Sequence, residues 1–158
     1  TTWHTQIDVQ RITFTGHPRA KTTITINIPP GGAATMPLPA DITTPDDPRQ
    51  ELITADGAYH YFAEDIDLTY PPAAVDIVVR PTTNGADVDI TAHTFVRDLT
   101  LFADRLDPTA DTDRQLVTLL PGETVTLHVT GGTSLPAPAD PAWRTAPALR
   151  TANDLITP

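Results

Sequence analysis

The stretch ADVDITAHTFVRDLTLFA, residues 86–103, decides the fold. Its apolar side chains alternate with polar ones, which is typical of a β-strand with one buried face. The apolar residues occupy even positions from Val88 to Ala92 and odd positions from Phe95 onward. Because successive side chains of a strand point to opposite faces, this change of phase predicts a β-bulge or a change of sheet within residues 94–98.

Arg97 and Asp98 fall at this predicted bend and allow two interpretations. In the first, the bend aims both charged side chains toward a functional site. In the second, which we favour, the bend only carries the chain between the two layers of a β-sandwich.

The same alternation recurs elsewhere, and turn signals separate the alternating stretches. Seventeen prolines interrupt nearly every window long enough for a helix, apart from one short turn expected around Pro48. The sequence therefore predicts an all-β fold built from β-sandwiches. The further strands are expected within residues 6–14, 21–28, 75–80 and 123–129, and the turns at 29–32, 83–85 and 121–122.

Composition limits the function as well. The chain has 158 residues with a formal net charge of −10, which argues against binding to nucleic acid or to an anionic membrane and suits sugars or other protein domains. It contains no cysteine, and its five histidines are scattered singly. We therefore expect no cofactor and no metal site.

Pro71 and Pro72 predict a domain boundary, because adjacent prolines cannot donate to a β-ladder. Two small sandwiches are expected, over residues 1–71 and 73–131. The Pro- and Ala-rich tail that follows is expected to run extended over a surface.

Three clusters could carry chemistry, and each also has a structural interpretation. Asp104, Asp107, Asp111 and Asp113 could bind calcium, but their spacing matches no EF-hand, so a solvated acidic loop is favoured. Glu64, beside Asp65 and Asp67, is the best candidate for a glycosidase-type acid, although an exposed strand end is favoured.

The third cluster is aromatic. Tyr59 and Tyr61 lie two residues apart and share one strand face, so with Phe62 they could stack on sugar rings. Packing in a core or between domains is the favoured alternative.

Four segments resemble, in order and at comparable spacing, the C-terminal region of bacterial β-mannosidases of glycoside hydrolase family 2. The resemblance is good from about Glu51 to Leu155 and looser before it. The segments are YHYFAEDIDLTYPPA (59–73), HTFVRDLTLFADRLDP (93–108), QLVTLLPGETVTLHV (115–129) and PALRTANDL (147–155).

This resemblance implies two immunoglobulin-like β-sandwich domains. Residues 1–71 would be the penultimate domain of the parent enzyme, without its first strands, and residues 73–158 the C-terminal domain with its tail. In such enzymes the catalytic glutamates of retaining hydrolysis lie on a (β/α)₈ barrel. No residue here matches that motif, so no catalytic residue is expected in this chain.

The implied function is that of accessory domains in an enzyme that removes terminal non-reducing β-D-mannose residues. Their partners would be the catalytic barrel and, in a homodimer, a second subunit, with no nucleic acid or membrane. There are two alternatives. One is an independent carbohydrate-binding module that uses Tyr59 and Tyr61, and the other is a cell-surface adhesion domain. The residues do not decide the compartment, although the cytoplasm is slightly favoured over secretion.

Overall fold

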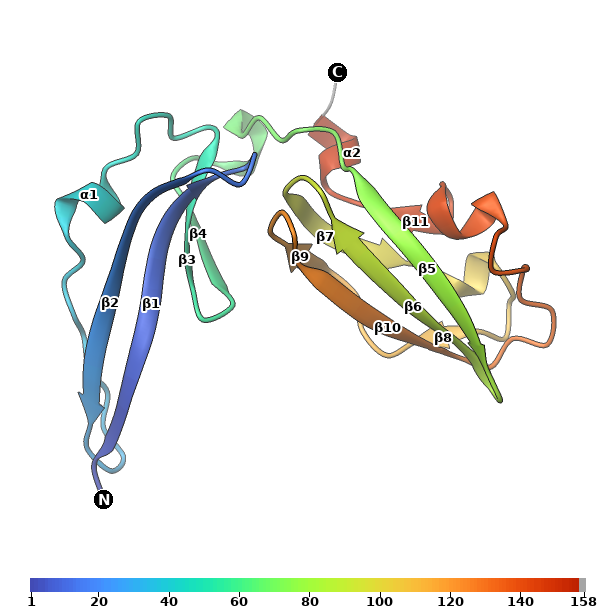
Figure 1. Ribbon diagram of the computed structural model, residues 1–158, viewed down its shortest axis with the longest axis horizontal. Helices are drawn as coiled ribbons and strands as arrows, with labels where there is room; N and C mark the ends of the chain where they lie inside the picture. The colour runs from blue at the N-terminus through green and yellow to red at the C-terminus, as the bar shows by residue number, and fades with distance from the viewer. Residues whose placement is uncertain (157–158) are drawn as a thin grey trace. The chain divides into compact units, whose positions relative to one another are not determined.

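The computed structural model describes residues 1–156, and the chain divides into two compact units, Thr1–Thr69 and Tyr70–Pro158. The division lies beside the Pro71–Pro72 pair. Both units are built mainly from antiparallel strands, which confirms the all-β class (Figure 1). No helix in residues 1–156 is long and apolar enough to cross a membrane.

The first unit contains one four-stranded antiparallel sheet among its described residues, in the order β2-β1-β3-β4. A long connection between β2 and β3 carries the short helix α1, and a 3₁₀ turn, η1, follows β4. The bounds are β1 (Trp3–Thr13), β2 (Pro18–Ile28), α1 (Ala40–Thr43), β3 (Glu51–Ala55), β4 (Ala58–Tyr61) and η1 (Asp65–Asp67).

The two faces of this sheet differ sharply. Ile7 pairs with Ile24 on one face, whereas the neighbouring pair, Asp8 with Thr23, lies on the other. The alternation predicted for residues 21–28 is therefore confirmed. The sheet therefore has one aliphatic face. Its other face is polar along much of β1 and β2 but carries the buried side chains of Ile12 and Leu52 where β1 pairs with β3.

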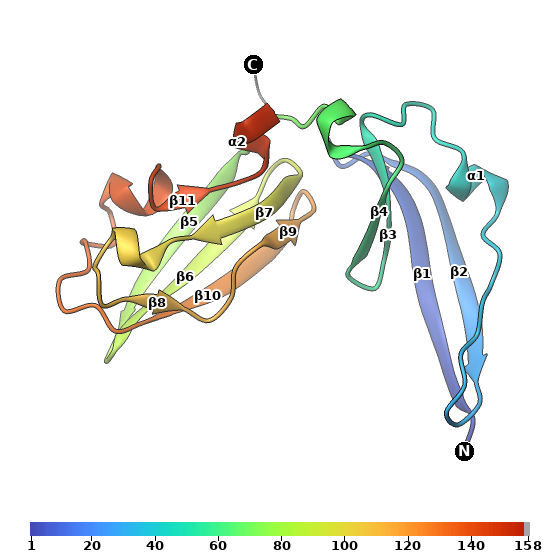
Figure 2. The same ribbon diagram turned by 180° about the vertical axis from the view of Figure 1, so that it is seen from behind.

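The second unit is a two-sheet sandwich with strand orders β5-β6-β10-β8 and β11-β7-β9. Figure 2 shows β7 and β9 in front of β5, β6 and β10. Apolar side chains from both sheets form one buried core, centred on Val88, Ile90, Leu99, Leu101 and Leu127. The bounds are β5 (Val75–Thr82), β6 (Gly85–Ala92), β7 (Val96–Leu101), η2 (Ala103–Arg105), β8 (Asp111–Thr112), β9 (Val117–Leu119), β10 (Thr124–Thr130), η3 (Pro141–Arg144), β11 (Leu149–Arg150) and α2 (Asn153–Ile156).

The predicted bend in residues 94–98 is confirmed, both as a bulge and as a change of sheet. The β7–β9 register shifts between Val96 and Leu99, and Asp98 has a φ of 52°. The Arg97 amide donates to Asn153 Oδ1 at 2.9 Å, and its guanidinium donates to the Tyr70 hydroxyl. These contacts lie within the sandwich itself, which agrees with the topological interpretation of the bend.

The predicted turns form at the expected places. The Gly32 amide donates to Pro29 O at 3.0 Å, and the Glu123 amide donates to Leu120 O at 3.0 Å across Pro121–Gly122. The hairpin at residues 83–85 is tight, and Gly85 pairs with Thr82 at its base. Gly85 is required there, because a Cβ at this position would lie 2.0 Å from the carbonyl oxygen of Val129.

The tail differs from the expectation. Residues 131–140 contain no helix or strand, as an extended segment would, but the rest of the tail completes the sandwich. Trp143, which carried no signal in the sequence, is fully buried in the core, and its indole N–H donates to Pro136 O and Ala137 O. Leu149 pairs with Leu101 of β7, so the tail supplies both a strand and the largest core side chain.

Candidate functional site

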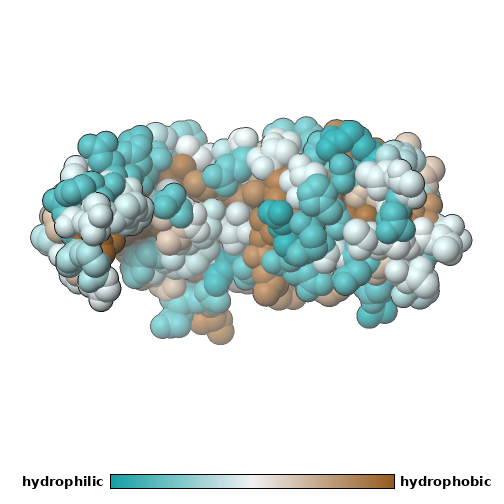
Figure 3. Space-filling view, turned by 90° about the horizontal axis from the view of Figure 1, so that it is seen from below, coloured by the Kyte–Doolittle hydropathy of each residue, from teal (hydrophilic) through white to brown (hydrophobic). Residues whose placement is uncertain are grey.

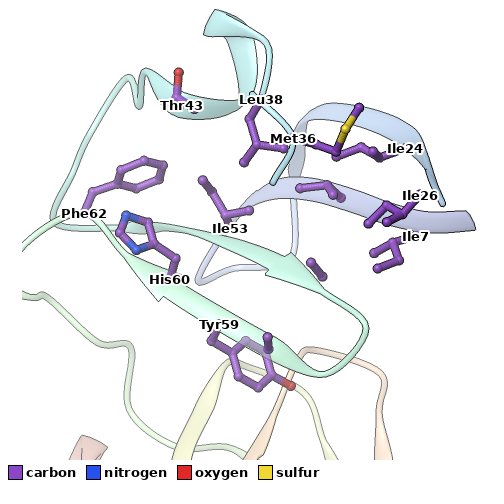
Figure 4. A pocket seen from close by; sticks show the side chains of 13 residues that line it. Ile7, Ile24, Ile26, Met36, Leu38, Thr43, Ile53, Tyr59, His60 and Phe62 are labelled. Atoms are coloured by element: carbon purple, nitrogen blue, oxygen red, sulfur yellow. The ribbon is translucent and has the colours of Figure 1, made fainter. Parts of the chain in front are cut away.

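A groove of about 540 Å³ lies on the aliphatic face of the first sheet. Its floor comes from β1, β2 and β3, and the connection between β2 and β3 borders it (Figure 4). We call it the aliphatic groove. Its principal lining side chains are Ile7, Val9, Ile24, Ile26, Leu38 and Ile53.

The groove is only partly covered. Leu38 packs against the small core of Val9, Ile42 and Ile53, and Ile42 of α1 is fully buried there. Farther along, Ile24 stays half-exposed, and Met36 and Trp3 are exposed. In the view of Figure 3, much of the visible surface is polar, and hydrophobic patches show between the polar side chains.

A buried ion pair holds the covering connection in place. The Arg11 guanidinium contacts Glu51, both side chains are almost completely buried, and Arg11 Nε donates to Asp41 O at 2.9 Å. Glu51 Oε1 also accepts from the Asp47 amide at 3.3 Å. The pair therefore fastens residues 41–47 to one end of the sheet and leaves the other end of the aliphatic face open.

The chemistry of the groove is that of an apolar contact surface. Its lining contains no Asp, Glu, Lys or Arg, and His60 is the one imidazole in it. The His60 ring meets Phe62 edge-on, with ring centroids 5.5 Å apart. Since no carboxylate pair faces this space, the groove has no groups for acid–base hydrolysis but can bury an aliphatic surface.

The three predicted aromatic residues do not form one platform. In the β3–β4 pairing, Tyr59 lies opposite Thr54 and Tyr61 opposite Leu52, which places both tyrosines on one face of the edge strand. Tyr59 and Phe62 both line the groove, but Figure 4 shows the Tyr59 ring on the other side of the strand from His60. Both tyrosines are half-buried, and their binding of carbohydrate stays a prediction.

The acidic cluster around Glu64 lies in and beside η1. Glu64 precedes this turn, Asp65 and Asp67 belong to it, and all three residues are exposed. None of them lines the aliphatic groove. This places the best candidate acid on an exposed turn.

The four aspartates within residues 104–113 do not form one metal-binding cluster. Asp107 is buried and accepts hydrogen bonds from the Thr109 hydroxyl at 2.7 Å, the Thr109 amide at 2.8 Å and the Ser134 amide at 2.7 Å. These hydrogen bonds, that from the Thr109 hydroxyl first, hold the pKa of Asp107 below its usual value. Asp107 therefore ties its loop to the tail, and no group of three His, Asp or Glu residues within residues 1–156 could hold a metal ion.

The outer face of the β5-β6-β10-β8 sheet is charged and solvated. Asp89 accepts from Arg80 and, at 2.7 Å, from the Thr126 hydroxyl, and these contacts lower the pKa of Asp89 to about 2. His128 contacts Asp87 at 2.8 Å. These pairs join neighbouring strands of one exposed face, which is a structural role.

Sequence reasoning identified β1 and β2, which form part of the groove, but it did not identify β3 or the groove itself. Alternation shows which side chains of β1 and β2 share a face, yet it does not show whether another layer covers that face. No protein-family model matches this chain, and no curated protein is significantly similar to it. The groove is therefore interpreted from its own chemistry.

The buried pair gives a direct test of how the groove is built. Glu51→Ala should lower the free energy of unfolding by about 3–5 kcal/mol, because it removes the buried partner of the Arg11 charge and leaves only the exposed Asp46 carboxylate, at 3.3 Å. Replacing both members, as Arg11→Met with Glu51→Leu, should restore most of that loss. Urea denaturation of the three proteins measures the difference.

Asp8→Ala is the matched control, since Asp8 pairs with Lys21 at 2.7 Å but both side chains are exposed. It should leave the denaturation midpoint unchanged. If Glu51→Ala shifted the midpoint no more than Asp8→Ala does, the pair could not be the fastening described above.

Proposed function

We propose that this chain is a pair of non-catalytic accessory domains from a β-mannosidase of glycoside hydrolase family 2. The parent enzyme would hydrolyse terminal non-reducing β-D-mannose residues, and these domains would support its catalytic barrel or its dimer interface. The observation that carries the proposal is the aliphatic groove, an apolar sheet face with no ionised side chain in its lining. The four segments that resemble these enzymes supply the particular family.

The groove supports a packing role for a general physical reason. Protein domains are normally built from at least two layers, because an apolar sheet face in water is unfavourable. Here a single connection covers only one end of the face. Another protein surface laid against the remaining isoleucines would remove them from water, and this is what an accessory domain does for the domain it supports.

The positions of the glutamates also support a non-catalytic role. A retaining glycosidase needs two carboxyl groups about 5 Å apart on either side of the scissile bond. Glu51 is paired with Arg11 in a buried site, and Glu123 accepts from the Leu120 amide at 2.8 Å within its own turn. Glu64, the remaining glutamate, is exposed beside η1.

The proposal predicts that the chain by itself does not hydrolyse an aryl β-D-mannoside, whereas the longer parent polypeptide does. Release of the aryl group, followed by absorbance at equal molar concentrations, compares the two. Turnover by the chain alone that disappears in Glu64→Gln would contradict the proposal. Asp56→Asn, at another exposed carboxylate on the β3–β4 turn, controls for a general effect of removing surface charge.

A second candidate function, an independent carbohydrate-binding module, is favoured by one observation: Tyr59 and Tyr61 share a face of the edge strand β4. Calorimetric titration with mannose and manno-oligosaccharides tests it. Saturable heat in the wild-type chain that is lost in Tyr61→Ala but kept in Phe62→Leu would establish this function. Under the accessory-domain proposal, no binding is expected at millimolar sugar.

A further inference from the structure

The hairpin between β5 and β6 carries a reactive pair of residues at its tip (Figure 1). Asn84 lies in the turn, and Gly85, the first residue of β6, follows it. Asparagine is a thermolabile residue, and it is most reactive before glycine, since no Cβ then shields the next amide nitrogen from the asparagine side chain. Asn84 is exposed, and its side chain makes no hydrogen bond to any other residue between positions 1 and 156. Its amide group is therefore free to turn toward the backbone.

The fold itself requires glycine after Asn84. Gly85 has a φ of 143°, a conformation that residues with a side chain rarely adopt. The carbonyl oxygen of Val129 occupies the place that a Cβ of Gly85 would need. An unshielded amide nitrogen beside Asn84 is therefore a fixed feature of this hairpin.

The other two asparagines of the chain lie in protected surroundings. Asn27 precedes Ile28, whose branched side chain shields the amide nitrogen between them, and the Asn27 side chain contacts His4. Asn153 is fully buried, and its side chain makes three hydrogen bonds, one of them from the Arg97 amide at 2.9 Å. The chain thus contains its own controls for the two properties that govern this reaction, namely access and the following residue.

We propose that Asn84 is a site of spontaneous deamidation, with water as the only other reactant. The amide nitrogen of Gly85 attacks Cγ of Asn84, so a new C–N bond forms and the bond from Cγ to the side-chain nitrogen breaks. That nitrogen leaves as ammonia, together with the proton of the Gly85 amide, and a cyclic imide remains. Water then adds to one of the two imide carbonyl carbons and opens the ring, which yields either an aspartyl or an isoaspartyl residue. No atom is oxidised or reduced.

The two products differ in their effect on the hairpin. The Asn84 carbonyl oxygen accepts from the Gly131 amide at 3.0 Å, and Gly85 pairs with both Thr82 and Thr130. An aspartyl residue keeps this backbone. An isoaspartyl residue adds a methylene group to the main chain and turns the accepting carbonyl into a carboxylate outside it. The isoaspartyl product therefore loosens the end of the β5-β6-β10 sheet, whereas the aspartyl product only adds a surface charge.

The site is tested by incubating the chain at body temperature and neutral pH and mapping its peptides by mass spectrometry. Asn84 should convert about tenfold or more faster than Asn153, because the buried site must open before it can react. An isoaspartate-specific methyltransferase should label the wild-type chain but not Asn84→Gln, in which the longer side chain forms the ring far more slowly.

A synthetic peptide of residues 80–89 controls for protection by the hairpin. If Asn84 stayed intact in the folded chain for as long as the peptide takes to convert completely, the proposal would be wrong. Conversion of Asn27 at the same rate as Asn84 would also overturn it, since neither the following glycine nor the free side chain would then matter.

The effect on the fold has its own measurement. Asn84→Asp should melt at the same temperature as the wild type, because it keeps the backbone of the turn. The isoaspartyl fraction of the incubated chain, separated by chromatography, should melt a few degrees lower, because the contact with Gly131 is lost. Equal melting temperatures of this fraction and Asn84→Asp would contradict the loosening of the sheet. The reaction needs only this chain and water, so both results are independent of the assignment to β-mannosidases.

Discussion

The buried ion pair of Arg11 and Glu51 is the interaction on which the first unit depends. It joins the end of β1 to the start of β3 and fastens the connection before β3 over one end of the sheet. Because charged side chains are costly to bury singly, the pair specifies where that connection lies. The other end of the aliphatic face is left open as a groove, and an apolar contact surface is therefore built into the way this unit folds.

The same logic extends to the second unit. Its core is closed by its own tail, so the exposed side chains of Phe102, Leu116 and Leu155 are not needed to complete it. Its acidic residues act within the unit, as Asp107 does in joining a loop to the tail. Both units thus use charged side chains to hold the fold and leave apolar side chains exposed, which agrees with the supporting role proposed above.

Much of the fold could be predicted because alternation is a local property. The isoleucines of residues 24–28 and the change of phase after Ala92 correctly indicated a half-buried strand and a bend between sheets. The place of Trp143 in the core could not be predicted, since its Pro-rich surroundings carry no periodicity and its partners lie far away in the sequence. The aliphatic groove and the left-handed conformation of Leu116, with a φ of 56°, could not be predicted for a related reason: exposure and φ follow from the tertiary arrangement.

The central claim is that the rest of a parent polypeptide covers the exposed apolar surfaces of these two units. Hydrogen exchange measured by mass spectrometry, on the chain alone and within the parent, tests it most directly. The account predicts that amides of β2 and of residues 114–118 exchange about tenfold or more slowly within the parent, because contacts there suppress local opening. Equal exchange rates in the two proteins at both places would contradict it.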